Sequence, residues 1–208
     1  MAPDWRRVPW KLRYRTLPTI ASKGRKAAVR ATNLHADVSF GPHCRVGQGF
    51  ELDIAGTGTF RAGMGVDFRR GFICEIGGDG VVDIGELSVF TSNMLIQVST
   101  RLTIGRRCVF GQSSMIADGN HRFRDYTQHL LDQGYDFQPI TIEDHAVAMS
   151  KCTIVASIGR GAVIAANSVV TRPIPAYCLA AGAPAKVIEY FGPPDECPEG
   201  LEHLLRSS

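Results

Sequence analysis

The sequence has no hydrophobic run long enough to form a membrane-spanning helix. No stretch of about eighteen consecutive apolar residues, the length such a helix needs, occurs among its 208 residues. Five cations within the first fifteen residues interrupt every apolar stretch there, so we expect no signal peptide. These absences argue against a helical membrane protein. They predict a cytoplasmic protein, free or held at the inner face of the membrane.

Paired cysteines are also missing. The six cysteines are widely separated and none forms a C-x-x-C pair, which argues against a zinc knuckle or a thioredoxin-like redox site. The histidines outside residues 118–125 have no carboxylate or cysteine at the spacing of a metal-ligand set. We therefore expect no catalytic metal, and we expect the cysteines to be small buried residues.

Negative charge is almost absent from residues 1–30. They contain nine lysine and arginine residues and one aspartate, whereas residues 31–208 carry a net charge of −5. Three interpretations stay open for this basic segment: contact with an anionic membrane, electrostatic binding of nucleic acid, or packing as a cap on the rest of the chain. No recognition motif accompanies the charges, so nucleic acid ranks last and we expect no nucleic-acid partner.

What the sequence does contain is a six-residue repeat. From residue 84 onward an apolar residue leads each unit and a small residue often follows it. The leading residues are Ile84, Phe90, Ile96, Ile104, Phe110, Ile116, Ile142, Ala148, Ile154, Ile158, Ile164 and Val170. This period fits neither a helix nor an alternating strand, and it is shorter than the strand spacing of a β-sandwich. The repeat predicts an all-β solenoid whose short strands each form one side of a coil.

Three segments lack the repeat and set the expected organisation. A basic N-terminal segment, residues 1–32, includes a helical stretch near Ala21–Ala31. Residues 119–139 form a polar, aromatic excursion within the solenoid of residues 33–188, and a loop of this length is typical of a functional element. Residues 189–208 form a proline-containing tail, in which we expect a turn and a short helix.

The stretch PITIEDHAVAMSKCTIVASIGRGAVIAANSVVTRPIPAYCLAAGAPAKVI, residues 139–188, resembles the hexapeptide-repeat acyltransferases. The similarity is to the branch that O-acetylates sugars and polysaccharides, and it includes the SVVT-x-x-IP turn and the terminal AG-x-P-A-K-V-I signature. The resemblance implies a left-handed parallel β-helix and a homotrimer. It also implies transfer of an acyl group, most simply acetyl, from acyl-CoA to a hydroxyl or amine.

His121 is the candidate catalytic residue. The resemblance places a histidine at the junction of coil and excursion, and an imidazole with a pKa near 6.5 can accept a proton from an attacking sugar hydroxyl. Asp118, Asn120 and Asp125 flank it and are candidates for supporting the imidazole or binding the acceptor. The resemblance adds Asn93 as an acceptor-binding or polarising group.

The resemblance also implies residues that contact acyl-CoA. Ser150 and Ala166 correspond to the small residues that line the acyl and pantetheine portions, and Thr171, Arg172 and Lys186 correspond to those near the phosphates. Fixed cations neutralise phosphates well, which fits Arg172 and Lys186.

The resemblance, together with the candidate site residues, thus implies an acyl-CoA-dependent O-acyltransferase acting on a sugar, polysaccharide precursor or glycolipid. Two alternatives stay open. One is an N-acyltransferase acting on an amino sugar or antibiotic, and the other is a noncatalytic β-helix scaffold.

Overall fold

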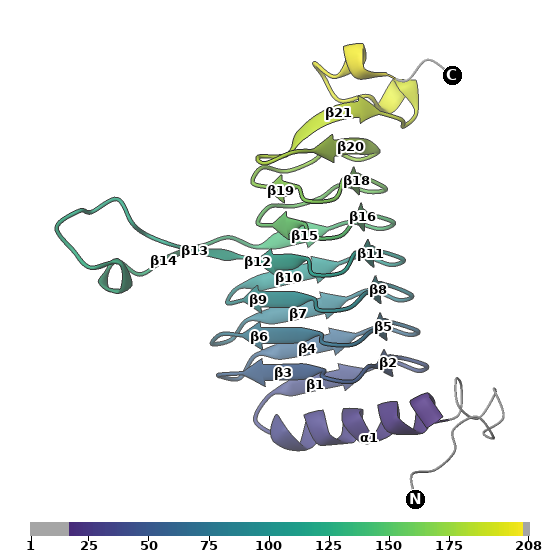
Figure 1. Cartoon of the computed structure of the whole chain (residues 1–208), viewed down its shortest axis with the longest axis vertical. Coiled ribbons are helices and arrows are strands. Elements are labelled where there is room, and N and C mark those ends of the chain that lie inside the picture. The colour runs from purple at the N-terminus through teal and green to yellow at the C-terminus, as the bar shows by residue number, and fades with distance from the viewer. Residues whose placement is uncertain (1–16, 206–208) are drawn as a thin grey trace, which may run out of the picture.

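The computed structural model describes residues 17–205, which wind into a stack of three-sided coils (Figure 1). Strands at equivalent positions in successive coils pair in parallel, so each side of the stack is a sheet. The predicted all-β fold is confirmed: the stack is a left-handed parallel β-helix of hexapeptide repeats.

The three sides are named sheets A, B and C. Sheet A contains β1 (Asp37–Phe40), β4 (Thr59–Ala62), β7 (Val81–Ile84), β10 (Arg101–Ile104) and β15 (Ile140–Ile142). Sheet B contains β2 (Arg45–Val46), β5 (Asp67–Phe68), β8 (Val89–Phe90), β11 (Val109–Phe110), β16 (Val147–Ala148), β18 (Val163–Ile164), β20 (Cys178–Ala181) and the antiparallel β21 (Lys186–Tyr190). Sheet C contains β3 (Glu51–Ile54), β6 (Ile73–Ile76), β9 (Leu95–Val98), β12 (Met115–Ala117), β17 (Thr153–Ile154) and β19 (Val169–Val170).

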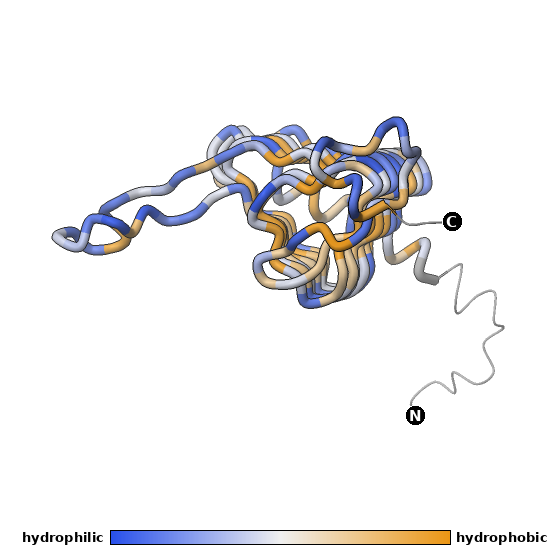
Figure 2. The backbone as a smooth tube through the Cα atoms, turned by 90° about the horizontal axis from the view of Figure 1, so that it is seen from above, coloured by the Kyte–Doolittle hydropathy of each residue, from blue (hydrophilic) through white to orange (hydrophobic). Residues whose placement is uncertain are grey.

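The core is a set of columns inside the stack. Alternate residues of each strand point inward, and cross-strand pairing places identical positions of successive coils above one another. Phe68, Phe90 and Phe110 form one such column, with ring centroids 5.1 Å and 4.9 Å apart and nearly parallel planes. Seen along the stack, the coils superimpose while residues between β12 and β15 project away from one corner (Figure 2). The leading apolar residue of each repeat therefore points into the stack and packs on the equivalent residues of the neighbouring coils.

The coils differ in length. Thr59 pairs with Val81, so an early coil takes 22 residues. Ile142, Ile158 and Ile174 are successive cross-strand partners, so the last coils take 16 residues each. The extra residues of the early coils lengthen the strands of sheets A and C to four residues.

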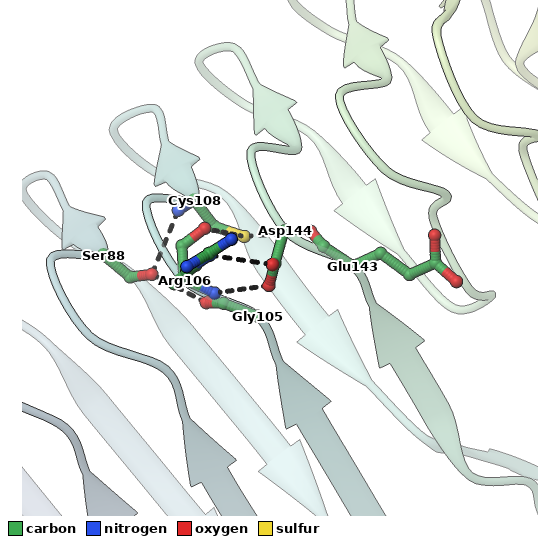
Figure 3. A network of polar contacts seen from close by, with 6 residues as sticks. All are labelled: Ser88, Gly105, Arg106, Cys108, Glu143 and Asp144. Atoms are coloured by element: carbon green, nitrogen blue, oxygen red, sulfur yellow. Dashed lines mark hydrogen bonds and ion pairs between the residues drawn. The ribbon is translucent and has the colours of Figure 1, made fainter.

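Small polar side chains close the corners from inside. Between sheets A and B, the Ser88 hydroxyl donates to the Gly105 carbonyl at 2.9 Å and accepts from the Cys108 N–H at 3.0 Å. The Cys108 thiol donates to the Glu143 carbonyl at 3.1 Å, one coil further on (Figure 3). These bonds satisfy backbone groups that turn away from the sheets at each corner.

The expectation for the cysteines is confirmed for five of the six. Cys44, Cys74, Cys108, Cys152 and Cys178 are buried, and Cys197 is partly buried. Burial raises the pKa of the Cys44, Cys108 and Cys178 thiols to about 11, so they stay protonated at neutral pH. They act as small core residues.

Helix α1 (Leu17–Thr32) lies across the first coil and covers the open end of the stack (Figure 1). Arg25 donates to the Val46 carbonyl at 3.0 Å and Lys26 to the Cys44 carbonyl at 2.9 Å. The Ser22 hydroxyl accepts from the Val46 N–H at 2.8 Å. The cap interpretation therefore holds for this helix, whose cations satisfy carbonyls that have no further coil to pair with.

The rest of the basic segment, residues 1–16, lies outside the described residues, so membrane contact through residues 1–30 stays a prediction. None of the described helices is both long and apolar enough to cross a bilayer. At the other end of the chain, residues 189–205 contain two short 3₁₀ helices, η4 (Pro194–Glu196) and η5 (Glu202–Leu204), where a turn and one short helix were expected.

Candidate active site

The excursion begins with an antiparallel pair of strands at the corner between sheets C and A, called here the excursion corner. Strand β13 (Gly119–His121) pairs with β14 (Tyr135–Phe137), and the 3₁₀ helix η3 (Leu130–Asp132) lies beyond them. A Cβ atom on Gly119 would lie 2.4 Å from the Phe137 ring, so only glycine lets this ring pack onto the strand. The pairing sets His121 directly opposite Tyr135.

The His121 ring is held by aromatic packing. Its centroid lies 4.1 Å from that of Tyr135, and Tyr135 stacks on Phe137 at 5.4 Å. The Nδ1 atom of His121 is buried and has no hydrogen-bond partner among the described residues. A buried ring nitrogen without a partner is costly in a purely structural residue, which points to a ligand-binding or catalytic role.

The predicted supporting carboxylates are engaged elsewhere. Asp118 is buried, and its carboxylate accepts from the Ser99 N–H at 3.0 Å, the Thr100 N–H at 2.6 Å and the Thr100 hydroxyl at 2.6 Å. It therefore fastens the start of the excursion to the preceding coil, three residues before His121.

Asp125 lies further out, in the loop between β13 and β14. Its carboxylate accepts from the hydroxyl and N–H of Thr127 and from the Gln128 amide. The Thr127 hydroxyl, followed by the Thr127 N–H, lowers the pKa of Asp125. Neither this carboxylate nor that of Asp118 hydrogen-bonds His121, so orientation of the ring rests on the aromatic stack instead.

His121, Asn120, Asp118, Tyr135 and Phe137 line a cavity of about 600 Å³. The cavity continues down the outer surface of sheet C, where three polar residues from successive coils form its wall. These are Gln97, Glu75 and Asp53, which are cross-strand neighbours. These three residues were not predicted from the sequence, because the repeat constrains the inward positions of a coil and not the outward ones. Their constant spacing of 22 residues, one early coil, was the available signal.

The other predicted residues fall on two corners. Asn93, Ser150 and Ala166 lie at the corner between sheets B and C, called here the B–C corner, where the Asn167 N–H donates to the Ser150 carbonyl and joins two coils. Lys186 pairs with Ala181 at the end of β20, close to the same corner. Thr171 and Arg172 instead follow β19 at the excursion corner, and both are exposed. Within one chain, the residues predicted to contact acyl-CoA are therefore not all beside His121.

Among residues 17–205 no group of three or more histidine, cysteine, aspartate or glutamate side chains could hold a metal ion. The fold and this cavity define a left-handed β-helix with a corner excursion that carries a histidine.

No family model matches the sequence. Two similar proteins are nevertheless assigned as acetyltransferases. The chain is 31% identical over 113 residues to Rv3034c of Mycobacterium tuberculosis, assigned as an acetyltransferase; the match covers 53% of this chain and 38% of the relative. It is 26% identical over 158 residues to WbbJ of Escherichia coli, assigned as an O-acetyltransferase of lipopolysaccharide biosynthesis, covering 72% of this chain and 80% of WbbJ.

Solved structures share the fold. A hexapeptide-repeat acetyltransferase of Vibrio cholerae in complex with acetyl coenzyme A superimposes with a TM-score of 0.55 at 21% identity, covering 82% of this chain and 78% of that one. A hexapeptide transferase family protein of Anaplasma phagocytophilum gives 0.51 at 18% identity, covering 68% and 76%. These findings show that the chain has the fold of the hexapeptide-repeat acyltransferases and is similar in sequence to acetyltransferases.

Proposed function

We propose that the protein transfers an acyl group, most simply acetyl, from acyl-CoA to a hydroxyl of a saccharide, with His121 as the general base. The observation that carries this proposal is the position of His121. Its ring lies in the wall of a cavity at the base of the excursion, with a buried Nδ1 that no described residue satisfies.

The chemistry needs no covalent enzyme intermediate. His121 accepts the proton of the acceptor hydroxyl as its oxygen attacks the thioester carbon. The C–S bond then breaks and the proton passes to the departing thiolate. A positioned base of this kind accelerates transfer by about 10²–10⁴-fold. The backbone N–H of Ser150, at the B–C corner, is suited to stabilise the oxyanion that forms on the thioester oxygen, whereas the neighbouring Met149 and Lys151 N–H groups bond to adjacent coils.

Acyl-CoA fits the B–C corner. Ser150 and Ala166 present small side chains in adjacent coils there, and Lys186 supplies a cation for a phosphate at the upper end. Because His121 lies on another corner, a complete site requires that a second copy bring its B–C corner against the excursion. Thr171 and Arg172, on the excursion corner, then approach the same CoA from the other copy.

Sheet B carries the surface for such an assembly. Its outward residues Val89, Val109, Val147, Val163 and Leu179 are successive cross-strand partners and form an apolar column, called here the valine column. A continuous apolar column on a sheet face is typical of a subunit interface. Three copies packed through these columns form the homotrimer that we propose, with one site at each junction of two copies.

An amine acceptor is the second candidate, because the same base serves it. A 53-residue stretch of the chain is 40% identical to a 2,3,4,5-tetrahydropyridine-2,6-dicarboxylate N-acetyltransferase of Staphylococcus aureus, a match that covers 22% of that enzyme. Parallel assays with hydroxyl and amine acceptors distinguish the two reactions.

The test is release of CoA from acetyl-CoA in the presence of saccharides, nucleotide-sugars and glycolipids. We expect release that depends on acceptor. A His121→Ala variant is expected to bind acetyl-CoA normally but to transfer at least about a hundredfold more slowly. Near-normal turnover by this variant would refute the role of His121.

A further inference from the structure

Two carboxylates in the cavity wall face each other without a cation. Asp53 and Glu75 are direct cross-strand partners on sheet C, and both are exposed to the cavity. Like charges directly opposite each other destabilise a sheet. Within residues 17–205, no lysine, arginine or histidine forms an ion pair with either of them.

On the other two sheets, outward carboxylates form ion pairs with arginine. On sheet A, Arg61 lies between Asp37 at 2.6 Å and Asp83 at 3.5 Å. On sheet B, Arg45 binds Asp67 through two hydrogen bonds of 2.6 Å. Arginines therefore neutralise carboxylates on the faces away from the cavity, while the pair inside the His121 cavity is left with unbalanced negative charge.

This pair belongs to a polar column that leads away from His121. Adjacent rungs of a sheet lie about 4.8 Å apart, so Gln97, Glu75 and Asp53 lie about 5, 10 and 14 Å below Ala117, the last residue of β12. Gln97 donates to Glu75 at 2.7 Å, which fixes both side chains and leaves the remaining carboxylate and amide oxygens as acceptors. Tyr135 and Phe137 supply an aromatic wall at the upper end.

We propose that this column, called here the acidic column, is an extended acceptor subsite for a saccharide longer than one ring. The ligand presents hydrogen-bond donors, hydroxyl or ammonium groups, to Gln97, Glu75 and Asp53. The column disfavours acceptors that carry phosphate or carboxylate at this end, because the uncompensated charges repel them. The proposal rests on the proposed function, since it assigns the acceptor class of the same site.

The experiment compares acceptors matched in sugar and different in length and charge. The probes are N-acetylglucosamine, neutral trisaccharides of glucose, mannose and N-acetylglucosamine, triglucosamine and UDP-N-acetylglucosamine. Binding is measured by saturation-transfer NMR and transfer by CoA release, using the full chain and its Glu75→Gln/Asp53→Asn variant. Asp37→Asn on sheet A, outside the cavity, is the matched control for loss of a carboxylate.

We expect a neutral trisaccharide or triglucosamine to bind the wild type more tightly than N-acetylglucosamine or the nucleotide-sugar does. The double variant should raise the dissociation constant and KM of that trisaccharide about tenfold, the loss expected for hydrogen bonds to a charged group, with kcat nearly unchanged. The nucleotide-sugar should bind no more weakly to the variant than to the wild type, and Asp37→Asn should behave as the wild type.

The acidic column is refuted if the wild type binds none of the trisaccharides, binds the nucleotide-sugar best, or keeps its trisaccharide affinity in the double variant. Loss of the homotrimer in the double variant, seen by sedimentation, also overturns the subsite by assigning the carboxylates to an interface. Failure of the proposed function gives a different result: acetyl-CoA is not consumed with any acceptor, including acceptors that bind.

Discussion

At the scale of single residues, the position of His121 is set by contacts of the residues beside it in the chain. No hydrogen bond to its Nδ1 atom from a described residue contributes. Gly119 admits the Phe137 ring, and Asp118 fixes the point where the chain leaves the coil. The Asp118 carboxylate is buried and accepts hydrogen bonds from three donor groups of Ser99 and Thr100. We therefore interpret Asp118 as a positioning residue that acts on His121 through the backbone.

Replacing Asp118 by asparagine tests this interpretation. In the asparagine variant an NH₂ group replaces one carboxylate oxygen. Because NH₂ cannot accept a hydrogen bond from a backbone N–H, the free energy of unfolding should fall by about 2 kcal/mol. Urea denaturation measures the change. Asp136→Asn, which removes an exposed ion pair with Arg122, should change it by less than about 0.5 kcal/mol. Equal stability of the two variants would contradict the positioning role.

At the scale of elements, sheets A, B and C have different outer surfaces although their inner surfaces are alike. Sheet A presents alternating arginine and aspartate, sheet C presents the acidic column, and sheet B presents the valine column. The valine column has no covering element within the described chain. Its size and continuity are the reason for placing the proposed trimer interface on sheet B.

Charged substitution in the valine column should dissociate the assembly. We expect the wild type to sediment at three times the 22.6 kDa mass of the chain. A Val109→Glu/Val147→Glu variant should sediment as a folded monomer, because burial of two carboxylates at an interface is costly. The matched variant Thr103→Glu on sheet A should remain trimeric. A monomeric wild type would contradict the assembly, as would a trimeric double variant.

The repeating coils could be predicted from the sequence, but the polar residues on their outward-facing surfaces could not. Ile142, Ile158 and Ile164 identified the coil because inward positions must be apolar in every turn. Asp53, Glu75 and Gln97 were missed because outward positions obey no such rule. The bonds of Asp118 to Ser99 and Thr100 depend on which coil neighbours the excursion, which no local pattern contains.

At the scale of the whole molecule, buried thiols make the stack sensitive to alkaline pH. Burial raises the pKa of Cys44, Cys108 and Cys178 to about 11, whereas the thiol of an unfolded chain ionises near 9.0. Unfolding therefore releases protons above the lower value. The stability that these thiols contribute is complete below about pH 8.5 and is lost as the pH rises toward 11.

Urea denaturation as a function of pH measures this loss. We expect the free energy of unfolding to fall between about pH 9 and pH 11, and a Cys108→Ala/Cys178→Ala variant to lose less over the same interval. An identical alkaline slope in the variant would show that other groups cause the loss.

The arrangement of the proposed trimer also determines the proposed site. His121 lies on the excursion corner of one copy, and Ser150 and Ala166 lie on the B–C corner, so each proposed site combines two copies. A chain carrying His121→Ala and a chain carrying Ala166→Trp should each be inactive as homotrimers. The first lacks the base, and the second blocks the acyl-CoA surface with an indole.

Co-expression of these two chains tests the central claim most directly. In mixed trimers assembled at random from equal amounts, about a quarter of the junctions combine an intact His121 with an intact Ala166. We predict that acetyl transfer returns to about a quarter of the wild-type rate per site. Mixed trimers as inactive as either homotrimer would show that His121 and Ala166 do not act together across two copies, and would contradict the account.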